Sequence, residues 1–214
     1  KGAVHMLEQE ASLQEPLETE VKFLLQDTTN LQRHIAATGA VSRGRFFETN
    51  YRFDDSNDSL LKNASLLRLR HDDCARLTFK AKPRQTDTQF KTYQEYEVIV
   101  SDFETMTRIL ERLGYRRRQV YEKWRETFVL DDTLLCIDTM PFGNFLEIEG
   151  TREAITQFAA RLGFDWELRI LANYLEIFTL IKHRFNLPFN DVTFQNFESV
   201  QIDIEPVIRQ ITAS

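Results

Sequence analysis

Apolar side chains recur every three to four residues in four segments, which is the spacing of the buried stripe on an amphipathic helix. These segments cover residues 27–38, 102–113, 151–162 and 168–185. Asp102 and Thr151 occupy the positions expected for helix N-caps, and a glycine follows each of these two helices. The predicted inward face of the last helix consists of Leu168, Leu171, Leu175, Phe178 and Ile181.

Between the helical segments, apolar and polar residues alternate, which is typical of β-strands with one buried face. The predicted strands cover residues 17–25, 40–54, 65–72, 74–82, 91–101, 117–130, 133–140 and 144–150. Short turn sequences, such as Asp131-Asp132, separate neighbouring strands and favour hairpins. These elements predict an α+β fold: an eight-stranded antiparallel sheet that closes into a barrel, with helices packed outside.

The polar faces of the strands carry charges of one sign in pairs. The pairs are Glu18 with Glu20, Arg68 with Arg70, Lys80 with Lys82, Glu95 with Glu97, Lys123 with Arg125, and Glu147 with Glu149. Lys22 follows the first pair on the same face. A sheet face that simply meets water accounts for any single pair. Neighbouring like charges repel, however, so their repetition along the chain indicates a site for a highly charged ligand.

If the sheet closes, the charged face becomes the lining of a lumen. Arginine and lysine side chains in such a lumen would bind an anion, and paired carboxylates would bind a divalent metal such as Mg²⁺ or Mn²⁺. A polyphosphate chain is the anion that needs both, because metal ions bridge and neutralise its oxygens. The pattern therefore predicts a polyphosphate site inside the barrel.

Composition narrows the class of protein. Of 214 residues, 42% are hydrophobic and 28% are charged, which is typical of one ordinary globular domain. The formal net charge of −6 disfavours nucleic acid as a partner. A run of about 18 apolar residues is absent, so we expect no transmembrane helix and no membrane partner. Two cysteines, Cys74 and Cys136, are too few for a disulfide framework or a cysteine-based zinc site. Both cysteines are expected to be reduced core residues, and a cytoplasmic location is the default expectation.

Several segments resemble, in collinear order, the motifs of one known family. Glu18-Thr19-Glu20-Val21-Lys22 is similar to the ExExK motif of the CYTH superfamily, the triphosphate tunnel metalloenzymes. The further segments that resemble this family are residues 51–55 (YRFDD), 67–70 (LRLR), 77–82 (LTFKAK), 95–97 (EYE), 123–125 (KWR), Asp138, and 143–149 (GNFLEIE). The resemblance extends from about residue 17 to about residue 180.

The resemblance implies a triphosphate tunnel with two Mg²⁺ or Mn²⁺ ions and a role for each charged side chain. The implied metal ligands are Glu18, Glu20, Asp138, Glu147 and Glu149. The implied substrate-binding residues are Lys22, Arg68, Arg70, Lys80, Lys82, Lys123 and Arg125, with Glu95 and Glu97 as further candidates. Glu95 and Glu97 either orient neighbouring basic residues or reach the second metal. Glu20, Glu149 and Lys22 are the candidate catalytic residues.

Three activities are compatible with these motifs. The first is metal-dependent hydrolysis of inorganic triphosphate or a related triphosphate, by attack of an activated water. The second is cyclisation of ATP to cyclic AMP and pyrophosphate, as in the class IV adenylyl cyclases of this family. The third is a binding module without turnover. Thiamine triphosphate is disfavoured, because Leu66 stands where that branch of the family carries a stacking tryptophan.

The expected organisation has three parts. Residues 1–6 are set aside as a vector-derived remnant, residues 7–184 form the CYTH tunnel domain, and residues 185–214 form an extension of unknown role. We expect the aromatic extension, together with the last helix, either to cover one tunnel end or to make a contact in a homodimer. The sequence does not decide between these two roles. The expected partner is a small molecule that contains a triphosphate, either inorganic triphosphate or a nucleoside triphosphate.

Overall fold

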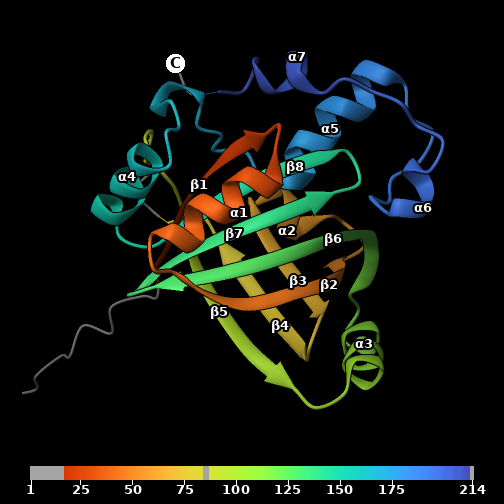
Figure 1. Cartoon of the computed structure of the whole chain (residues 1–214). Helices are drawn as coiled ribbons and strands as arrows, with labels where there is room; N and C mark the ends of the chain where they lie inside the picture. Colours follow the sequence, from red (N-terminus) through yellow and green to blue (C-terminus); the bar gives the residue numbers. More distant parts are fainter. Residues whose placement is uncertain (1–16, 84–86, 213–214) are drawn as a thin grey trace, which may run out of the picture.

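The computed structural model describes residues 17–83 and 87–212, and within them eight antiparallel strands form a closed ring (Figure 1). The ring order is β1-β5-β4-β3-β2-β6-β7-β8. The strands are β1 (Leu17–Leu25), β2 (Val41–Asp54), β3 (Ser65–His71), β4 (Ala75–Ala81), β5 (Lys91–Val100), β6 (Arg116–Leu130), β7 (Thr133–Met140) and β8 (Gly143–Glu149). Each strand begins and ends within one residue of its predicted bounds, and the predicted fold class is confirmed. Residues 1–6 lie outside the described ranges.

Hairpins and long pairings hold the ring together. The longest pairing joins β2 to β6, and β1 closes the ring through only four residue pairs with β5, from Leu17 with Gln94 to Glu20 with Lys91. The predicted turn at Asp131 is present, with φ of +50° at a residue type that tolerates this conformation. Alternation along each strand then places one set of side chains inside the ring and the other set outside.

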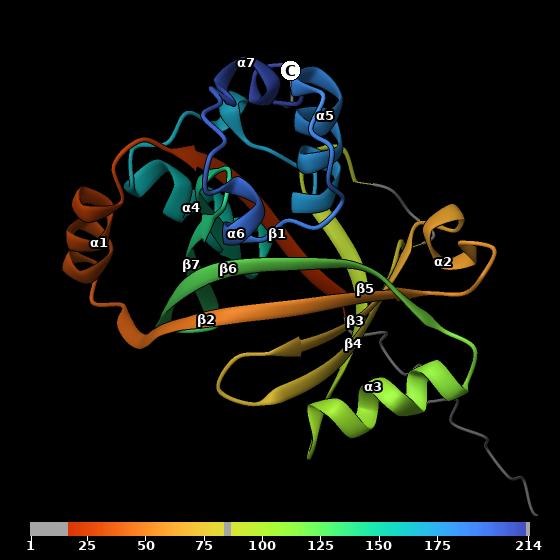
Figure 2. The same cartoon turned by 90° about the vertical axis from the view of Figure 1, so that its right-hand side faces the viewer.

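The outward apolar side chains are covered by helices. Helices α1 (Thr28–Ala37) and α4 (Arg152–Arg161) pack on β1, β7 and β8, and α3 (Phe103–Arg112) packs on β3 (Figure 2). Asp27, Asp102 and Thr151 cap these helices by accepting hydrogen bonds from backbone N–H groups of the first turn. The short helix α2 (Ser59–Lys62) connects β2 to β3.

The last long helix begins later than the sequence predicts. Residues 166–168 form one 3₁₀ turn, and α5 extends from Tyr174 to Phe185. The backbone of Ile170 instead pairs with Lys22 through two hydrogen bonds of 3.1 and 2.8 Å, which holds this segment extended. Asn173 then starts the helix with a capping box to Glu176. The expectation that Leu168 faces inward is therefore wrong, and this residue is 54% exposed.

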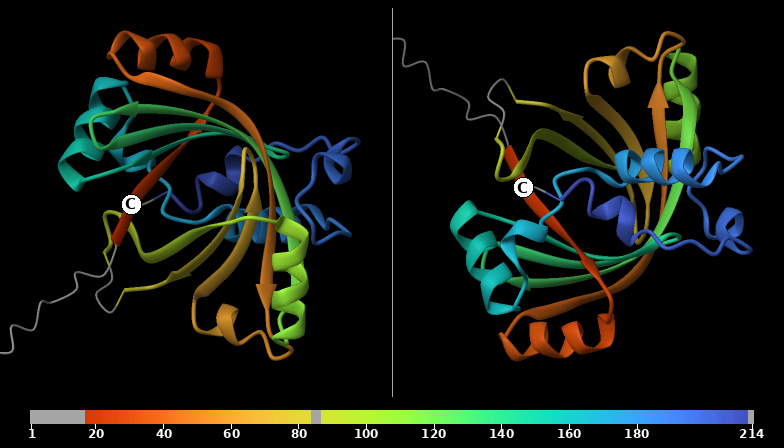
Figure 3. Two further views of the ribbon diagram at one scale, coloured as in Figure 1. Left: turned by 90° about the horizontal axis from the view of Figure 1, so that it is seen from below. Right: turned by 90° about the horizontal axis from the view of Figure 1, so that it is seen from above.

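Helix α5 and the residues after it close one end of the barrel. In Figure 3, seen from above, α5 lies across the ring of strands. At this end the inner faces change from charged to apolar: Leu24 follows Lys22, and Phe145 precedes Glu147. These side chains share one hydrophobic core with α5 and with α6 (Phe194–Phe197) and α7 (Glu205–Ile208). Residues 185–212 thus pack into the same structure as the barrel.

Membrane-spanning helices are absent from the part of the chain that the structure describes. None of the helices there combines the length and the apolar character that crossing a bilayer requires. The longest, α5, has 12 residues.

Candidate functional site

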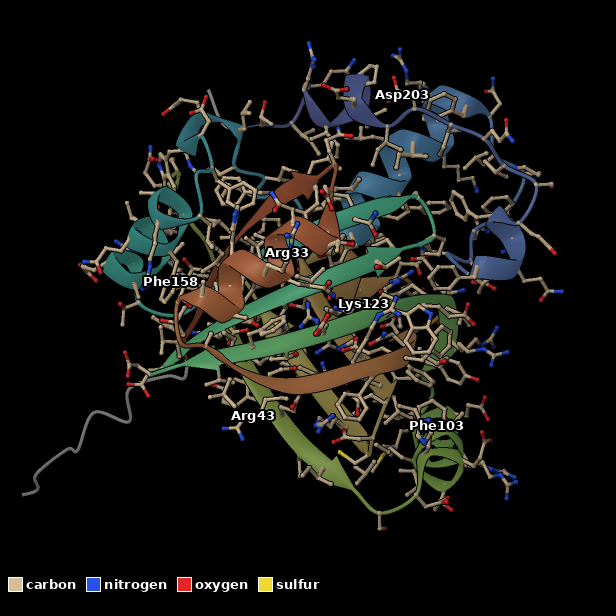
Figure 4. All side chains as sticks on the ribbon, in the orientation of Figure 1. Arg33, Arg43, Phe103, Lys123, Phe158 and Asp203 are labelled. Carbon is tan, nitrogen blue, oxygen red and sulfur yellow. The ribbon has the colours of Figure 1, made fainter. Side chains whose placement is uncertain are left out.

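The barrel encloses a charged cavity of about 1420 Å³. Its lining contains every predicted site residue except Asp138, because these side chains share the inward face of their strands. Figure 4 labels Lys123, which projects from β6 into this interior. The predicted set that the cavity brings together comprises Glu18, Glu20, Lys22, Arg68, Arg70, Lys80, Lys82, Glu95, Glu97, Lys123, Arg125, Glu147 and Glu149. A single cavity thus collects charges from strands that are far apart in the sequence.

Strands β1 and β8 form the acidic side of the cavity. In the register of this pair, Glu20 lies opposite Glu149 and Lys22 lies opposite Glu147. The buried Lys22 ammonium bridges two carboxylates, at 2.5 Å from Glu20 and 2.9 Å from Glu147. Although burial opposes ionisation of Lys22, these two carboxylates raise its pKa above the ordinary value. Lys22 is therefore fixed as a cation at the centre of the acidic side.

Glu18 and Glu149 are less well neutralised. Within residues 17–83 and 87–212, the Glu18 carboxylate bonds only Lys80, and the Glu149 carboxylate has no hydrogen-bond or ion-pair partner. Burial, and then repulsion from Glu18 and Glu147, raises the pKa of Glu149 to about 8. Burial, and then repulsion from Glu20, raises the pKa of Glu18 to about 7. An added cation would relieve this repulsion, so the pair has the electrostatic character of a cation site.

Strands β6 and β7 supply a fixed basic group. The Arg125 guanidinium donates to both oxygens of Asp138, at 2.7 and 2.6 Å, and to Glu147 at 2.8 Å. Lys123 donates to the same Asp138 carboxylate at 3.0 Å. Asp138 is fully buried behind these two cations rather than lining the cavity. The structure therefore places it where it orients basic side chains, and its role as a metal ligand stays a prediction.

Strands β3, β4 and β5 form the rest of the basic side. Arg68 lies 3.9 Å from Glu95 and 3.8 Å from Glu97, and Arg70 lies 3.5 Å from Glu97. Glu95 also contacts Lys80 at 3.2 Å. Glu95 and Glu97 thus stand among basic side chains, which is the first of the two positions considered from the sequence. The Arg68 Nε atom has no hydrogen-bond partner in the described chain.

The structure adds three charged or polar residues that the sequence reasoning missed. Glu48 on β2 is buried between Lys123, Arg70 and Arg125, at 3.5 to 3.8 Å. Lys91 on β5 contacts Glu20 at 2.5 Å. Tyr174 on α5 donates its hydroxyl to Asp138 at 2.8 Å. The alternation that selected Glu95 and Glu97 also includes Lys91, so this residue was accessible to the same reasoning.

Glu48 is held as an anion by its neighbours. Burial opposes its ionisation, but Lys123, Arg125 and Arg70 outweigh burial and lower its pKa to about 2. Its Oε2 atom has no hydrogen bond, although Lys123 lies 3.5 Å away. Glu48 therefore neutralises the basic side without locking it in a directional hydrogen bond.

The two cysteines are free, and neither is suited to be a nucleophile. Cys74 lies partly exposed at the turn between β3 and β4, whereas Cys136 is buried and borders the cavity. Burial raises the pKa of the Cys136 thiol to about 12. The thiolate, not the thiol, is the nucleophile. The Cys136 thiol that borders the cavity is therefore protonated and unreactive.

A closed antiparallel barrel with acidic and basic sides around one cavity defines a tunnel protein suited to a polyanion and cations. The model of the CYTH domain matches residues 16–163, which is more than half of the chain. This protein therefore belongs to the CYTH domain family.

One curated protein is similar to this chain in sequence, and two solved structures are similar to it in fold. Over 134 residues the chain is 26% identical to "Putative adenylate cyclase MJ0240" of Methanocaldococcus jannaschii, covering 62% of this chain and 76% of that protein. The fold is similar to a protein of Vibrio parahaemolyticus described as a putative adenylate cyclase, with a TM-score of 0.69, 18% identity, and coverage of 78% and 99%. A Hippeastrum protein, HpAC1, is described as a putative adenylyl cyclase with a dominant triphosphatase activity; its TM-score is 0.51 at 15% identity, with coverage of 88% and 99%.

Proposed function

We propose that this protein hydrolyses inorganic triphosphate, or a related triphosphate, in a reaction that depends on a divalent metal. One observation carries the proposal: a single cavity holds carboxylates on the adjacent strands β1 and β8 and faces them with cations from β3, β4 and β6. In the ring order, β3 lies across from β1 and β8. A metal-bound triphosphate matches both sides, since its oxygens bind cations on every side.

The carboxylate set supports an enzyme rather than a simple anion binder. Four glutamates on β1 and β8 line the cavity: Glu18, Glu20, Glu147 and Glu149. In a protein that only captured an anion, these carboxylates would repel the anion and lower the affinity for it. The charge is useful where a divalent cation must be bound together with the phosphate chain.

The donor set fits Mg²⁺ or Mn²⁺. Carboxylate oxygens are the ligands that these hard cations prefer, and Glu18 and Glu149 lack full neutralisation by protein cations. We propose Glu18, Glu20, Glu147 and Glu149 as the metal-binding residues. When bound, the metal would supply Lewis-acid polarisation of phosphoryl oxygens and would lower the pKa of a water molecule.

The chain's own cations would hold the substrate. Arg68 and Arg70 present forked donors for phosphoryl oxygens, and Arg125 is fixed in place by Asp138 and Glu147. Lys80 and Lys123 add point charges that stabilise negative charge on the departing phosphate. Lys22, bridged to two carboxylates, would keep the acidic side in one arrangement rather than act as a base.

Adenylyl cyclisation is the second candidate. The Methanocaldococcus jannaschii relative carries that name, and the cavity extends beyond the cations to the apolar side chains of Leu61, Ala64 and Leu66. This extension offers room for the organic part of a nucleoside triphosphate. The triphosphate site itself would be shared by the two reactions, so the identity of the product decides between them.

A product assay tests the proposal. The purified protein is incubated with Mg²⁺ or Mn²⁺ and, separately, with inorganic triphosphate and ATP, and products are separated by ion-exchange chromatography. Phosphate and pyrophosphate from triphosphate, without cyclic AMP from ATP, support the hydrolase. Cyclic AMP with pyrophosphate from ATP supports the cyclase. If neither substrate yields product, hydrolysis of inorganic triphosphate and cyclisation of ATP are both excluded, and a binding module or another phosphorylated ligand is favoured.

A further inference from the structure

Tyr174 connects the helix that closes the barrel to the charged cavity. It is the first residue of α5, where Asn173 and Glu176 form the capping box. Its side chain is buried, and its ring packs against Phe145 of β8 at 5.3 Å between ring centres. Tyr174 therefore lies at the boundary between the hydrophobic core that closes one end of the barrel and the charged cavity.

The polar end of Tyr174 joins a group of hydrogen bonds on one carboxylate. Its hydroxyl donates to Asp138 Oδ2 at 2.8 Å, the same oxygen that accepts from Lys123 and from Arg125. Burial, and then repulsion from Asp138, raises the pKa of Tyr174, so the hydroxyl stays protonated and acts as the donor. Asp138 is thus held by a neutral donor from α5 and by two cations from β6.

The ring of Tyr174 also faces two ammonium groups. Lys22 Nζ lies 5.3 Å and Lys123 Nζ 5.4 Å from the ring centre, within the range of a cation–π contact. Lys22 belongs to the acidic side of the cavity and Lys123 to the basic side. One aromatic side chain therefore contacts both sides at the layer where the cavity ends.

We infer that Tyr174 is a positioning residue for the proposed triphosphate reaction. It acts through Asp138: the hydroxyl fixes the carboxylate, and the carboxylate fixes Lys123 and Arg125 in the orientation that binds phosphoryl oxygens. The inference rests on the proposed function for the identity of the ligand. It makes α5 a part of the site, because the seating of this helix sets the orientation of two substrate-binding cations.

Substitution of Tyr174 by phenylalanine removes the hydroxyl and keeps the ring. We expect Y174F to weaken the binding of inorganic triphosphate by about tenfold, because a hydrogen bond to a charged group is lost. Binding is measured by calorimetry in EDTA, so it requires neither metal nor turnover. The matched control is Y96F, since Tyr96 is 51% exposed on the outer face of β5 and should bind as the wild type does.

A double-mutant cycle with Asp138→Asn separates positioning from a merely structural role. If Tyr174 acts through Asp138, the double variant binds triphosphate no more than about twofold worse than D138N alone. If Tyr174 only anchors α5, the two losses multiply, and this result would overturn the inference. Unchanged affinity in Y174F would overturn it as well.

A readout without ligand keeps this test independent of the proposed function. The ¹⁵N signal of the Arg125 Nε–H group, assigned by comparison with Arg125→Lys, should shift in Y174F and stay unchanged in Y96F. An unchanged signal in Y174F would refute the positioning role even if triphosphate proved not to bind. Absence of hydrolysis by a wild-type protein that binds triphosphate would refute only the proposed function.

Discussion

Glu149→Gln is expected to stabilise the metal-free protein at alkaline pH. Burial, and then repulsion from Glu18 and Glu147, raises the pKa of Glu149 to about 8, above the ordinary value of 4.5. Since the folded pKa exceeds the unfolded one, ionising Glu149 opposes folding. This penalty is absent below about pH 4.5, grows as the pH rises, and is complete above about pH 8. Glutamine is neutral at every pH and avoids it.

The pKa shift sets the size of the effect. One pKa unit corresponds to about 1.36 kcal/mol, so a rise from 4.5 to about 8 corresponds to an upper limit of about 5 kcal/mol. Part of this energy is shared with Glu18, whose own pKa is raised to about 7. We expect the free energy of unfolding of E149Q to exceed that of the wild type by about 2 kcal/mol at pH 9 and to match it near pH 4.

The assay is urea denaturation in EDTA at pH 5, 7 and 9, with E104Q as the matched control. Glu104 is exposed on α3 and does not line the cavity, so E104Q should differ from the wild type by a small offset that does not grow across this range. A difference between E149Q and the wild type that is constant with pH would show that the pKa of Glu149 is not raised in the folded protein. Lower stability of E149Q at pH 9 would show the same. In a parallel urea denaturation without EDTA, added Mn²⁺ should stabilise the wild type more than E149Q, which lacks one of the four proposed carboxylate ligands.

Three further variants test separate parts of the site. E48Q should tighten metal-free binding of triphosphate by about threefold to tenfold in calorimetry, because the buried Glu48 no longer neutralises Arg70, Lys123 and Arg125; weaker binding would contradict this role. R70A should raise KM for triphosphate at least tenfold in initial-rate kinetics, since a forked donor is lost; unchanged KM and kcat would remove Arg70 from the site. N173A should lower the free energy of unfolding by about 1 kcal/mol in urea, through loss of the cap of α5; unchanged stability would show that the capping box adds nothing.

The barrel strands were predictable because alternation is a local property. In five of the six charged pairs an apolar residue separates the two charges. Between Glu147 and Glu149 this residue is Ile148, which packs in the hydrophobic core outside the ring. The start of α5 was not predictable from apolar spacing alone. Leu168 and Leu171 fit the helical period, but Ile170 pairs with Lys22 on β1, a contact between distant parts of the chain.

The site was predictable only in part for the same reason. Residues in same-sign pairs stood out, whereas Glu48 has no charged residue two positions away on either side. It becomes part of the cavity only when β2 pairs with β6. Tyr174 comes from a helix outside the ring, and nothing in its neighbourhood of the sequence indicates contact with Asp138. The closed end could have been suspected, because apolar Leu24 and Phe145 continue the charged faces of β1 and β8. The order of strands in the ring was needed to interpret this pattern, because β1 and β8 are neighbours only in the folded barrel.

The most direct test of the central claim is a crystal structure with Mn²⁺ and inorganic triphosphate. We expect anomalous scattering peaks among Glu18, Glu20, Glu147 and Glu149, with the phosphate chain or its product against Arg68 and the other cavity cations. Manganese or phosphate bound only outside the barrel, with the cavity free of both, would contradict the claim that the barrel interior is the active site.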